Sequence, residues 1–169
     1  EHIEDIKAAS LMSVSKVPVM SVDELALRLM NSDPSIQLVD VRSEEAFKQF
    51  ALPHALHGDI TAFINRDWRK VFNTRGKTVV LYADTESDAR KAAMAAEDLG
   101  YKNFKILQGG LDSFRSEILQ FKKPEGTFTI RLTDLYRFRE KAALVLPQII
   151  ESAKPKVVQK KSSRVLGGC

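Results

Sequence analysis

The sequence predicts an α/β fold in which a parallel β-sheet is flanked by helices on both faces. Two observations lead to this prediction. Segments typical of strands alternate along the chain with segments typical of helices, as they do when helices connect parallel strands. The strand-like segments are short and dense in branched apolar residues, which is typical of strands that are buried on both faces. The 169 residues are enough for one domain with a proper core.

The first predicted helix is marked by its capping signal. Ser21 and Glu24 have the spacing of a capping box, which predicts a helix that begins there and ends at about Met30. The other elements expected up to residue 72 are a weakly helical lead over 2–12, a strand over 36–41, a helix over 43–50, a short extended piece over 52–56 and a helix over 61–72.

The second half of the chain is divided by glycines and a proline. The elements expected there are strands over 78–82 and 104–107 and helices over 88–99, 111–119 and 133–153. Gly100 is the residue type that most often follows a helix C-terminus, and Gly109 and Gly110 interrupt the chain between a strand and a helix. Pro147 is expected to interrupt the last helix, because proline has no backbone N–H to donate.

Charge and composition set the domain organisation. The net charge of +4 is carried by residues 151–169, where five basic residues stand against one acidic residue. The first 150 residues are neutral, so we expect no nucleic-acid-binding groove in the folded part. The predicted segments are an N-terminal lead over 1–17, an α/β domain over 18–121, a linker and C-terminal helix over 122–153, and a basic, disordered tail over 154–169.

The single cysteine and the first residue exclude several protein classes. Cys169 is alone, so this chain has neither a disulfide framework nor a cysteine-cluster metal site. No apolar run reaches the length of about 18 residues that a membrane-spanning helix needs. The chain begins with Glu1 and has no signal-like segment, so we expect a processed chain or a piece of a longer protein.

Several short motifs in a fixed order resemble those of the rhodanese-like family. They are Val39-Asp40-Val41-Arg42, the acidic helix over 44–50 with the following Leu52-Pro53-His54-Ala55, the strand over 78–82, Leu99-Gly100-Tyr101, and Leu107-Gln108-Gly109-Gly110-Leu111. The resemblance covers roughly residues 18–121. It implies a rhodanese-like α/β domain with a parallel sheet, to which the helix over 133–153 is an extra C-terminal element.

The resemblance implies a cysteine nucleophile directly after the strand that ends at Tyr82, but this chain has Ala83 there. In the family, backbone N–H groups at a helix N-terminus stabilise that cysteine as a thiolate or persulfide, which passes sulfur to an acceptor. The spacing from Ala83 to Gly100 matches the family, so the alanine is a substitution. A methyl group cannot carry sulfur. The same argument excludes arsenate reductase and cell-cycle phosphatase activity, which use the same cysteine.

The loop after Ala83 also departs from the family. It consists of Asp84, Thr85, Glu86, Ser87 and Asp88. Its three carboxylates stand where the family holds an anion, and Asp88 replaces the family's arginine. Only Arg90, expected in the first turn of the next helix, is predicted to compensate. We therefore expect thiosulfate, phosphate or a protein persulfide to bind poorly at this loop.

The acidic loop has a second interpretation that we do not favour. Asp84, Glu86 and Asp88 alternate like the opening of a calcium loop, but the later glycine and bidentate glutamate of such a loop are missing. Helix capping by Thr85 or Ser87 explains the pattern better. We therefore predict no metal and no cofactor.

Other candidate residues have structural interpretations. His54 and His57 are interpreted as surface or loop residues and not as a catalytic or metal pair. Asp40 and Arg42 resemble residues that brace the family's active loop, and we interpret Asp40 as a capping residue and Arg42 as its partner. The buried side of the helix over 61–72 is expected to consist of Phe63, Ile64, Trp68 and Phe72.

Three hypotheses for function follow. The leading one is a rhodanese-like domain that is inactive as a sulfurtransferase and acts as a binding, regulatory or scaffolding module for a protein partner. The second is a sulfur-handling protein in which Cys169, behind Gly167 and Gly168, is a mobile thiol. The third is a domain of a larger, membrane-associated protein that contacts the membrane through its basic tail or an upstream segment. From the sequence we expect no nucleic-acid partner. The cellular compartment and the oligomeric state stay open.

Overall fold

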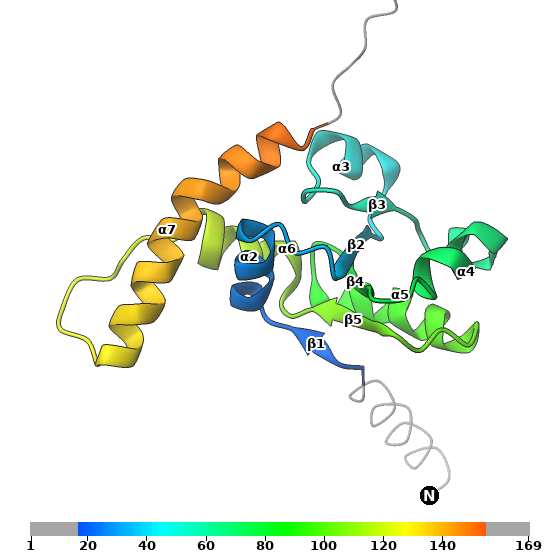
Figure 1. Cartoon of the computed structure of the whole chain (residues 1–169), viewed down its shortest axis with the longest axis horizontal. Helices are drawn as coiled ribbons and strands as arrows, with labels where there is room; N and C mark the ends of the chain where they lie inside the picture. The colour runs from blue at the N-terminus through cyan, green and yellow to red at the C-terminus, as the bar shows by residue number, and fades with distance from the viewer. Residues whose placement is uncertain (1–16, 155–169) are drawn as a thin grey trace, which may run out of the picture.

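The computed structural model describes residues 17–154 and contains a five-stranded parallel sheet (Figure 1). Its strands are β1 (Val19–Met20), β2 (Ile36–Asp40), β3 (Leu56–His57), β4 (Thr78–Tyr82) and β5 (Phe104–Leu107). They lie in the order β1-β5-β4-β2-β3, and each neighbouring pair is parallel. The predicted α/β class and parallel sheet are confirmed. The short strand β1 was not expected from the sequence.

The helical elements connect these strands and extend the chain beyond them. They are α2 (Val22–Met30), α3 (Glu44–Gln49), the 3-10 helix η1 (Ala62–Ile64), α4 (Arg66–Phe72), α5 (Glu86–Asp98), α6 (Gly110–Phe114), the π-helix η2 (Arg115–Leu119) and α7 (Ile130–Ser152). As predicted, the hydroxyl of Ser21 accepts the backbone N–H of Glu24 at the start of α2.

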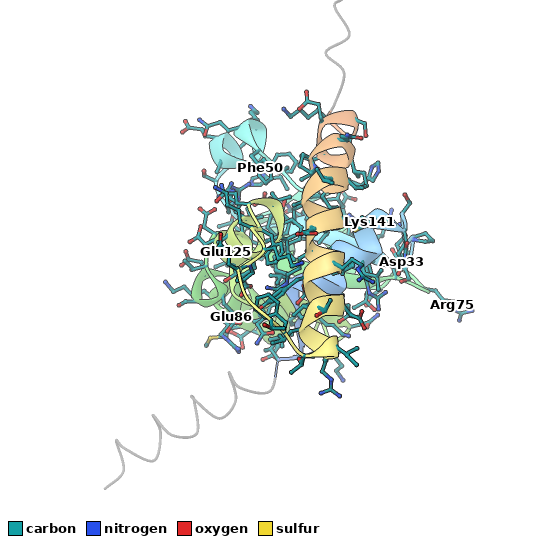
Figure 2. The ribbon with its side chains drawn as sticks, turned by 90° about the vertical axis from the view of Figure 1, so that its left-hand side faces the viewer. Asp33, Phe50, Arg75, Glu86, Glu125 and Lys141 are labelled. Carbon is teal, nitrogen blue, oxygen red and sulfur yellow. The ribbon has the colours of Figure 1, made fainter. Side chains whose placement is uncertain are left out.

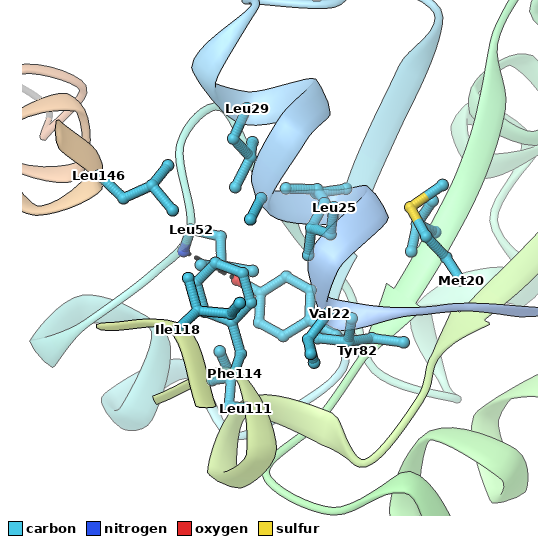
Figure 3. Packing of buried hydrophobic residues seen from close by; sticks show 14 of the residues in the cluster. Met20, Val22, Leu25, Leu29, Leu52, Tyr82, Leu111, Phe114, Ile118 and Leu146 are labelled. Atoms are coloured by element: carbon cyan, nitrogen blue, oxygen red, sulfur yellow. Dashed lines mark hydrogen bonds between the residues drawn. The ribbon is translucent and has the colours of Figure 1, made fainter. Parts of the chain in front are cut away.

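Buried side chains alternate along the central strands, so each face of the sheet has its own apolar core. In β4, Val80 and Tyr82 face one cluster, whereas Val79 and Leu81 face the other. The first cluster is covered by α2, α6, η2 and α7, and Figure 3 shows their side chains around Tyr82. The second is covered by η1, α4 and α5. Helices on both faces are therefore confirmed.

The predicted single helix over 61–72 is wrong. The chain forms η1 and then α4, because Asn65 between them has an extended backbone with ψ of 142°. This break turns Ile64 outward, where it is 70% exposed, so its predicted burial is also wrong. Phe63 and Phe72 are fully buried as expected, and Trp68 packs against them with part of its ring exposed.

The predicted interruption at Pro147 is also wrong, because α7 continues through it. Proline costs about 3 kcal/mol in a helix interior, mainly by removing one N–H donor. Pro147 is exposed, and Ala143, whose carbonyl lacks this donor, is a partly exposed residue. Leu146 and Ile150, on either side of the proline, are buried in the core and hold both parts of the helix on the domain.

The C-terminal helix α7 packs directly on the α/β domain. It contacts α2 and η2, and Arg139 forms an ion pair with Asp23 at 2.9 Å. The predicted segment boundaries at residues 121 and 153 stay predictions, and the predicted lead and tail lie almost wholly outside the described residues. Between residues 17 and 154, no helix combines the length and apolarity that crossing a membrane requires.

Candidate functional site

The site implied by the sequence lies at the C-terminal edge of the sheet, where β2 and β4 end side by side. Asp40 and Tyr82 are paired residues in the parallel register of these two strands. The chain therefore places residues 41–42 beside the loop that follows Tyr82. Ligands of parallel α/β sheets generally bind outside this edge.

Asp40 and Arg42 form a buried pair at this edge. The Asp40 side chain is fully buried, and that of Arg42 is 7% exposed. The Asp40 carboxylate accepts hydrogen bonds from the backbone N–H of Arg42 at 3.0 Å and from the guanidinium of Arg42 at 2.8 Å. Burial would lower the pKa of Arg42, but the hydrogen bond and charge of Asp40 outweigh this and raise it. The carboxylate thus caps a turn and neutralises a buried cation.

Arg42 also ties three segments together. Its guanidinium donates to the backbone carbonyl of Phe50, at the C-terminus of α3, and lies 3.4 Å from the carboxylate of Asp84 in the loop after β4. The carbonyl of Arg42 is 2.6 Å from the Nε2 of His57. One buried side chain therefore fixes α3, β2 and the loop relative to one another.

Tyr82 supports the same edge from within the core. Its hydroxyl accepts the backbone N–H of Leu52 at 3.1 Å, which Figure 3 shows as a dashed line. Burial, together with the charge of Asp40, raises the pKa of Tyr82 far above its usual value. Tyr82 is therefore a neutral phenol that anchors the segment between α3 and β3.

The loop after β4 is held closed by backbone hydrogen bonds. Ala83 is 3% exposed, and its methyl group packs in the second apolar cluster with α5. The carbonyls of Ala83 and Asp84 accept the N–H groups of Leu111 and Asp112 at 2.9 and 3.0 Å. The first N–H groups of α6 are thus used inside the protein. At the other end of the loop, Thr85 caps α5 by accepting the N–H of Asp88 at 3.2 Å.

Gly110 permits the close approach of α6 to this loop. It has φ of +67°, and a Cβ built there would lie 2.5 Å from the carbonyl oxygen of Asp84. Both the backbone conformation and the space require glycine. The glycine pair predicted only to interrupt the chain therefore locks the loop against α6.

Replacing Gly110 with alanine is expected to lower the free energy of unfolding by about 1–3 kcal/mol. The added methyl would clash with the backbone of Asp84 and Thr85 in addition to straining φ. Gly100→Ala is the matched control, because Gly100 has φ of +86° but no atom within 4 Å of the built Cβ. Urea unfolding of both variants measures the difference. Equal losses of stability would contradict the close-approach argument.

The prediction that Arg90 alone compensates the acidic residues of the loop is wrong. Asp84 is near Arg42 and also lies 3.8 Å from Arg115 of η2. Asp88 pairs with Lys91 at 3.5 Å, so Arg90 is not alone in compensating the acids. The sequence could not reveal this, because Arg42 and Arg115 reach the loop from other elements.

The side chain of Arg90 is bound by the carboxylate of Glu86. Because α5 begins at Glu86 and not at residue 88, Arg90 lies in the second turn and not in the first as predicted. The guanidinium of Arg90 donates to Oε2 of Glu86 at 3.0 Å, while Oε1 accepts the backbone N–H of Gly109 at 3.1 Å. A carboxylate of the protein itself thus lies between a guanidinium and a backbone donor.

Two residues that the sequence did not indicate complete the site. Arg115 places its guanidinium 4.9 Å above the ring of Phe50, which is a cation–π arrangement, while also approaching Asp84. This contact bridges η2 and α3 over the loop. A lone arginine and a lone phenylalanine 65 positions apart give no local signal, so only the fold could bring them together.

The remaining candidate residues do not join this arrangement, apart from His57. His54 is exposed and lies before β3, at the opposite edge of the sheet, and Ser87 is in the first turn of α5. Within the described part of the chain, no three His, Cys, Asp or Glu side chains form a group that could bind a metal ion. Cys169 lies outside the described residues, so its predicted role as a mobile thiol is untested.

Known proteins resemble this chain in sequence. A family model described as "rhodanese-like domain" matches residues 21–117, which is more than half of the chain. The human protein named centrosomal protein of 41 kDa is 27% identical over 130 residues, covering 73% of this chain and 34% of that protein. This chain therefore spans about a third of that relative.

Solved structures share the fold. A protein from Bacillus halodurans has a TM-score of 0.52 and 22% identity, covering 78% of this chain and 98% of that one. A thiosulfate sulfurtransferase from Pseudomonas aeruginosa has a TM-score of 0.50 and 27% identity, covering 59% of this chain and 19% of that one. The first likeness concerns the fold alone.

Proposed function

The chain belongs to the rhodanese-like domain family, and on that premise we propose that it is a member without sulfurtransferase activity that acts as a protein-binding or scaffolding module. The single observation that carries the proposal is Ala83. It stands directly after β4, at the position where the family's motif has its cysteine, and its side chain is a buried methyl group. Without a thiolate there is no atom at this position to accept and pass on sulfur.

The surroundings of Ala83 support loss of activity independently of the missing thiol. The Glu86 carboxylate holds both Arg90 and the N–H of Gly109, and Leu111 and Asp112 donate to the loop carbonyls. An incoming anion would have to displace the carboxylate or break these bonds. Thiosulfate and the Glu86 carboxylate are both anions, so they would compete for the same donors. The carboxylate is already bound to these donors, which disfavours binding of the substrate.

A binding role fits the rest of the chain. The buried pair of Asp40 and Arg42 and the closed loop make this edge rigid, which favours a preformed surface over a moving catalytic loop. Helix α7 adds exposed apolar side chains, with Leu144 74% exposed. The human relative bears the name of a centrosomal protein, and that name mentions no sulfur substrate. We propose a protein partner for this chain on these grounds.

The purified chain is expected to show no thiosulfate:cyanide sulfurtransferase turnover above background, and Ala83→Cys is expected to stay close to background. A thiol at residue 83 would be buried beside Asp84, and Glu86 would still hold the Gly109 N–H. An active rhodanese assayed in parallel provides the positive control.

Cys169→Ala serves as the matched control, because it removes the one native thiol. Turnover by the wild-type chain that survives Cys169→Ala would overturn the proposal. Turnover that disappears in Cys169→Ala would instead favour the mobile-thiol hypothesis. High activity of Ala83→Cys would show that the internal Glu86 contacts do not exclude substrate.

A further inference from the structure

A hollow lies at the end of the sheet opposite the loop that follows β4. It encloses about 310 Å³ where the ends of α2 and α7 meet the start of β2, and we call it the basal hollow. Its lining includes Leu29, Ile36, Gln37, Lys77 and Ile149. The volume is at the lower end of the range for ligand sites.

The basal hollow is at the N-terminal edge of the sheet. Ile36 and Thr78 are paired at the start of β2 and β4, whereas Ala83 follows the end of β4. Figure 2 shows Asp33, a lining residue, on one side of α7, and Phe50 and Glu86 of the loop region on the other. Occupation of the basal hollow would therefore leave the loop region uncovered.

The hollow combines an apolar wall with a fixed rim. Leu29 and Leu38 are buried, and Ile36 and Ile149 are partly exposed into the same space. Gln37 fixes one side by donating to the carbonyls of Leu38 and His54 at 3.0 and 3.1 Å. The apolar wall favours an apolar side chain, and the fixed rim lowers the entropy cost of binding it.

The opposite rim is fixed by Arg28. Its guanidinium donates to Glu24, to Asp33 at 2.8 Å and to Ser35 at 3.1 Å. Asp33 in turn accepts the N–H of Ser35 at 2.8 Å. These bonds use the positive charge of Arg28 internally, so Arg28 shapes the rim and is not the group available to a ligand.

Two backbone conformations distinguish this rim from the rest of the described chain. Among residues 17–154, the non-glycine residues with positive φ are Ser32, at 50°, and His54, at 57°, and both line the hollow. Such conformations are strained for residues with a Cβ and concentrate at functional sites. Their presence on two separate loops of one hollow supports a binding role.

Lys77 sets the charge that the hollow favours. Over residues 17–154 it has no ion-pair partner, whereas Arg28 pairs with both Glu24 and Asp33. A cation next to an apolar wall favours a ligand with a carboxylate beside an apolar group. The basic residues of 155–169 have the wrong charge for this position.

We propose that the basal hollow binds a segment of a partner protein that presents a large apolar side chain followed by Asp or Glu. The apolar side chain packs between Leu29, Ile36 and Ile149, and the carboxylate pairs with Lys77. This inference rests on the proposed protein-binding function and assigns it to the edge of the sheet opposite the family's active-site loop.

The test uses the full chain labelled for amide NMR and three short peptides blocked at both ends. Gly-Leu-Asp-Gly carries both required groups, Gly-Leu-Lys-Gly reverses the charge, and Gly-Ser-Asp-Gly removes the apolar side chain. We expect Gly-Leu-Asp-Gly to shift Gln37, Lys77 and Ile149, with a Kd of about 1 mM as befits a small contact. The other two peptides should bind at least about tenfold more weakly.

Two charge variants sharpen the test. Lys77→Glu should weaken Gly-Leu-Asp-Gly at least about tenfold and make Gly-Leu-Lys-Gly the better ligand. Arg75→Glu is the matched control, because Arg75 is an exposed cation in the same turn that does not line the hollow. It should change the Kd by no more than about twofold. Amide spectra of both variants establish that they are folded.

Other outcomes overturn the inference. Absence of shifts around the hollow with Gly-Leu-Asp-Gly, equal binding of all three peptides, or shifts confined to residues 83–88 would each do so. So would tighter binding of a synthetic peptide of residues 155–169 than of Gly-Leu-Asp-Gly. Sulfurtransferase turnover is measured in a separate assay, and none of these results would change the outcome expected there. Failure of this inference can therefore be distinguished from failure of the proposed function.

Discussion

Replacing Asp40 with asparagine is expected to lower the free energy of unfolding by about 3–5 kcal/mol. The substitution keeps the size of the side chain but leaves the guanidinium of Arg42, which is 7% exposed, without its closest anion. The remaining partners of Arg42 are the carbonyls of Ala46 and Phe50 and the more distant carboxylate of Asp84. Urea or thermal unfolding of the full chain measures the loss.

The matched control is Glu44→Gln. Glu44 pairs with Lys48 on α3, but both side chains are about 70% exposed, so removal of the charge should change stability little. The double variant Asp40→Leu with Arg42→Leu should be less destabilised than the sum of the two single leucine variants. Each single variant leaves one buried charge without its partner, whereas the double variant leaves none. Strict additivity would show that the two side chains do not act as a pair.

Replacing Leu146 with alanine is expected to cost about 2–5 kcal/mol of unfolding free energy. Leu146 is fully buried where α7 crosses the first apolar cluster, and Figure 3 shows it beside Leu29 and Leu52. Truncation would leave a cavity between α7 and the body of the domain. A loss of this size would show that α7, although outside residues 21–117, is part of the same cooperative unit.

Leu144→Ala provides the control on the same helix. Leu144 is 74% exposed, so its truncation removes few contacts and should leave stability almost unchanged. Because leucine and alanine have similar helix propensities, the two variants differ mainly in burial. If both substitutions had the same small effect, α7 would not be packed on the domain as the structure describes.

The rigidity of the loop region depends on backbone contacts in addition to the pair of Asp40 and Arg42. The loop is closed by carbonyl groups of Ala83 and Asp84, which depend on the glycine at residue 110. Asp40 and Arg42 support it from β2. The alanine at residue 83 and the use of the α6 donors inside the protein are therefore two separate grounds for the proposed lack of sulfurtransferase activity.

Local signals in the sequence were sufficient for strands β2, β4 and β5 and for most helices. The apolar runs that became β2 and β4 are short and uninterrupted, so their burial between two layers of helices could be predicted. The order of motifs placed Ala83 directly after β4, and the pairing of Asp40 with Arg42 was expected from their resemblance to residues that brace the family's loop. These features depend on residues close together in the chain.

Tertiary contacts decided the features that sequence reasoning missed or misjudged. Arg115 and Phe50 meet over Asp84, and α7 continues through Pro147 with Leu146 and Ile150 buried in the core. The basal hollow likewise exists only where α2, α7 and β2 meet, and its cation comes from Lys77 at the start of β4. Hydrophobic periodicity reports the burial of one face of an element, but not which distant charge, ring or helix will lie against it. The sequence by itself therefore determined the fold and the missing thiol, whereas packing between distant elements determined the charge balance of the loop and the shape of its surroundings.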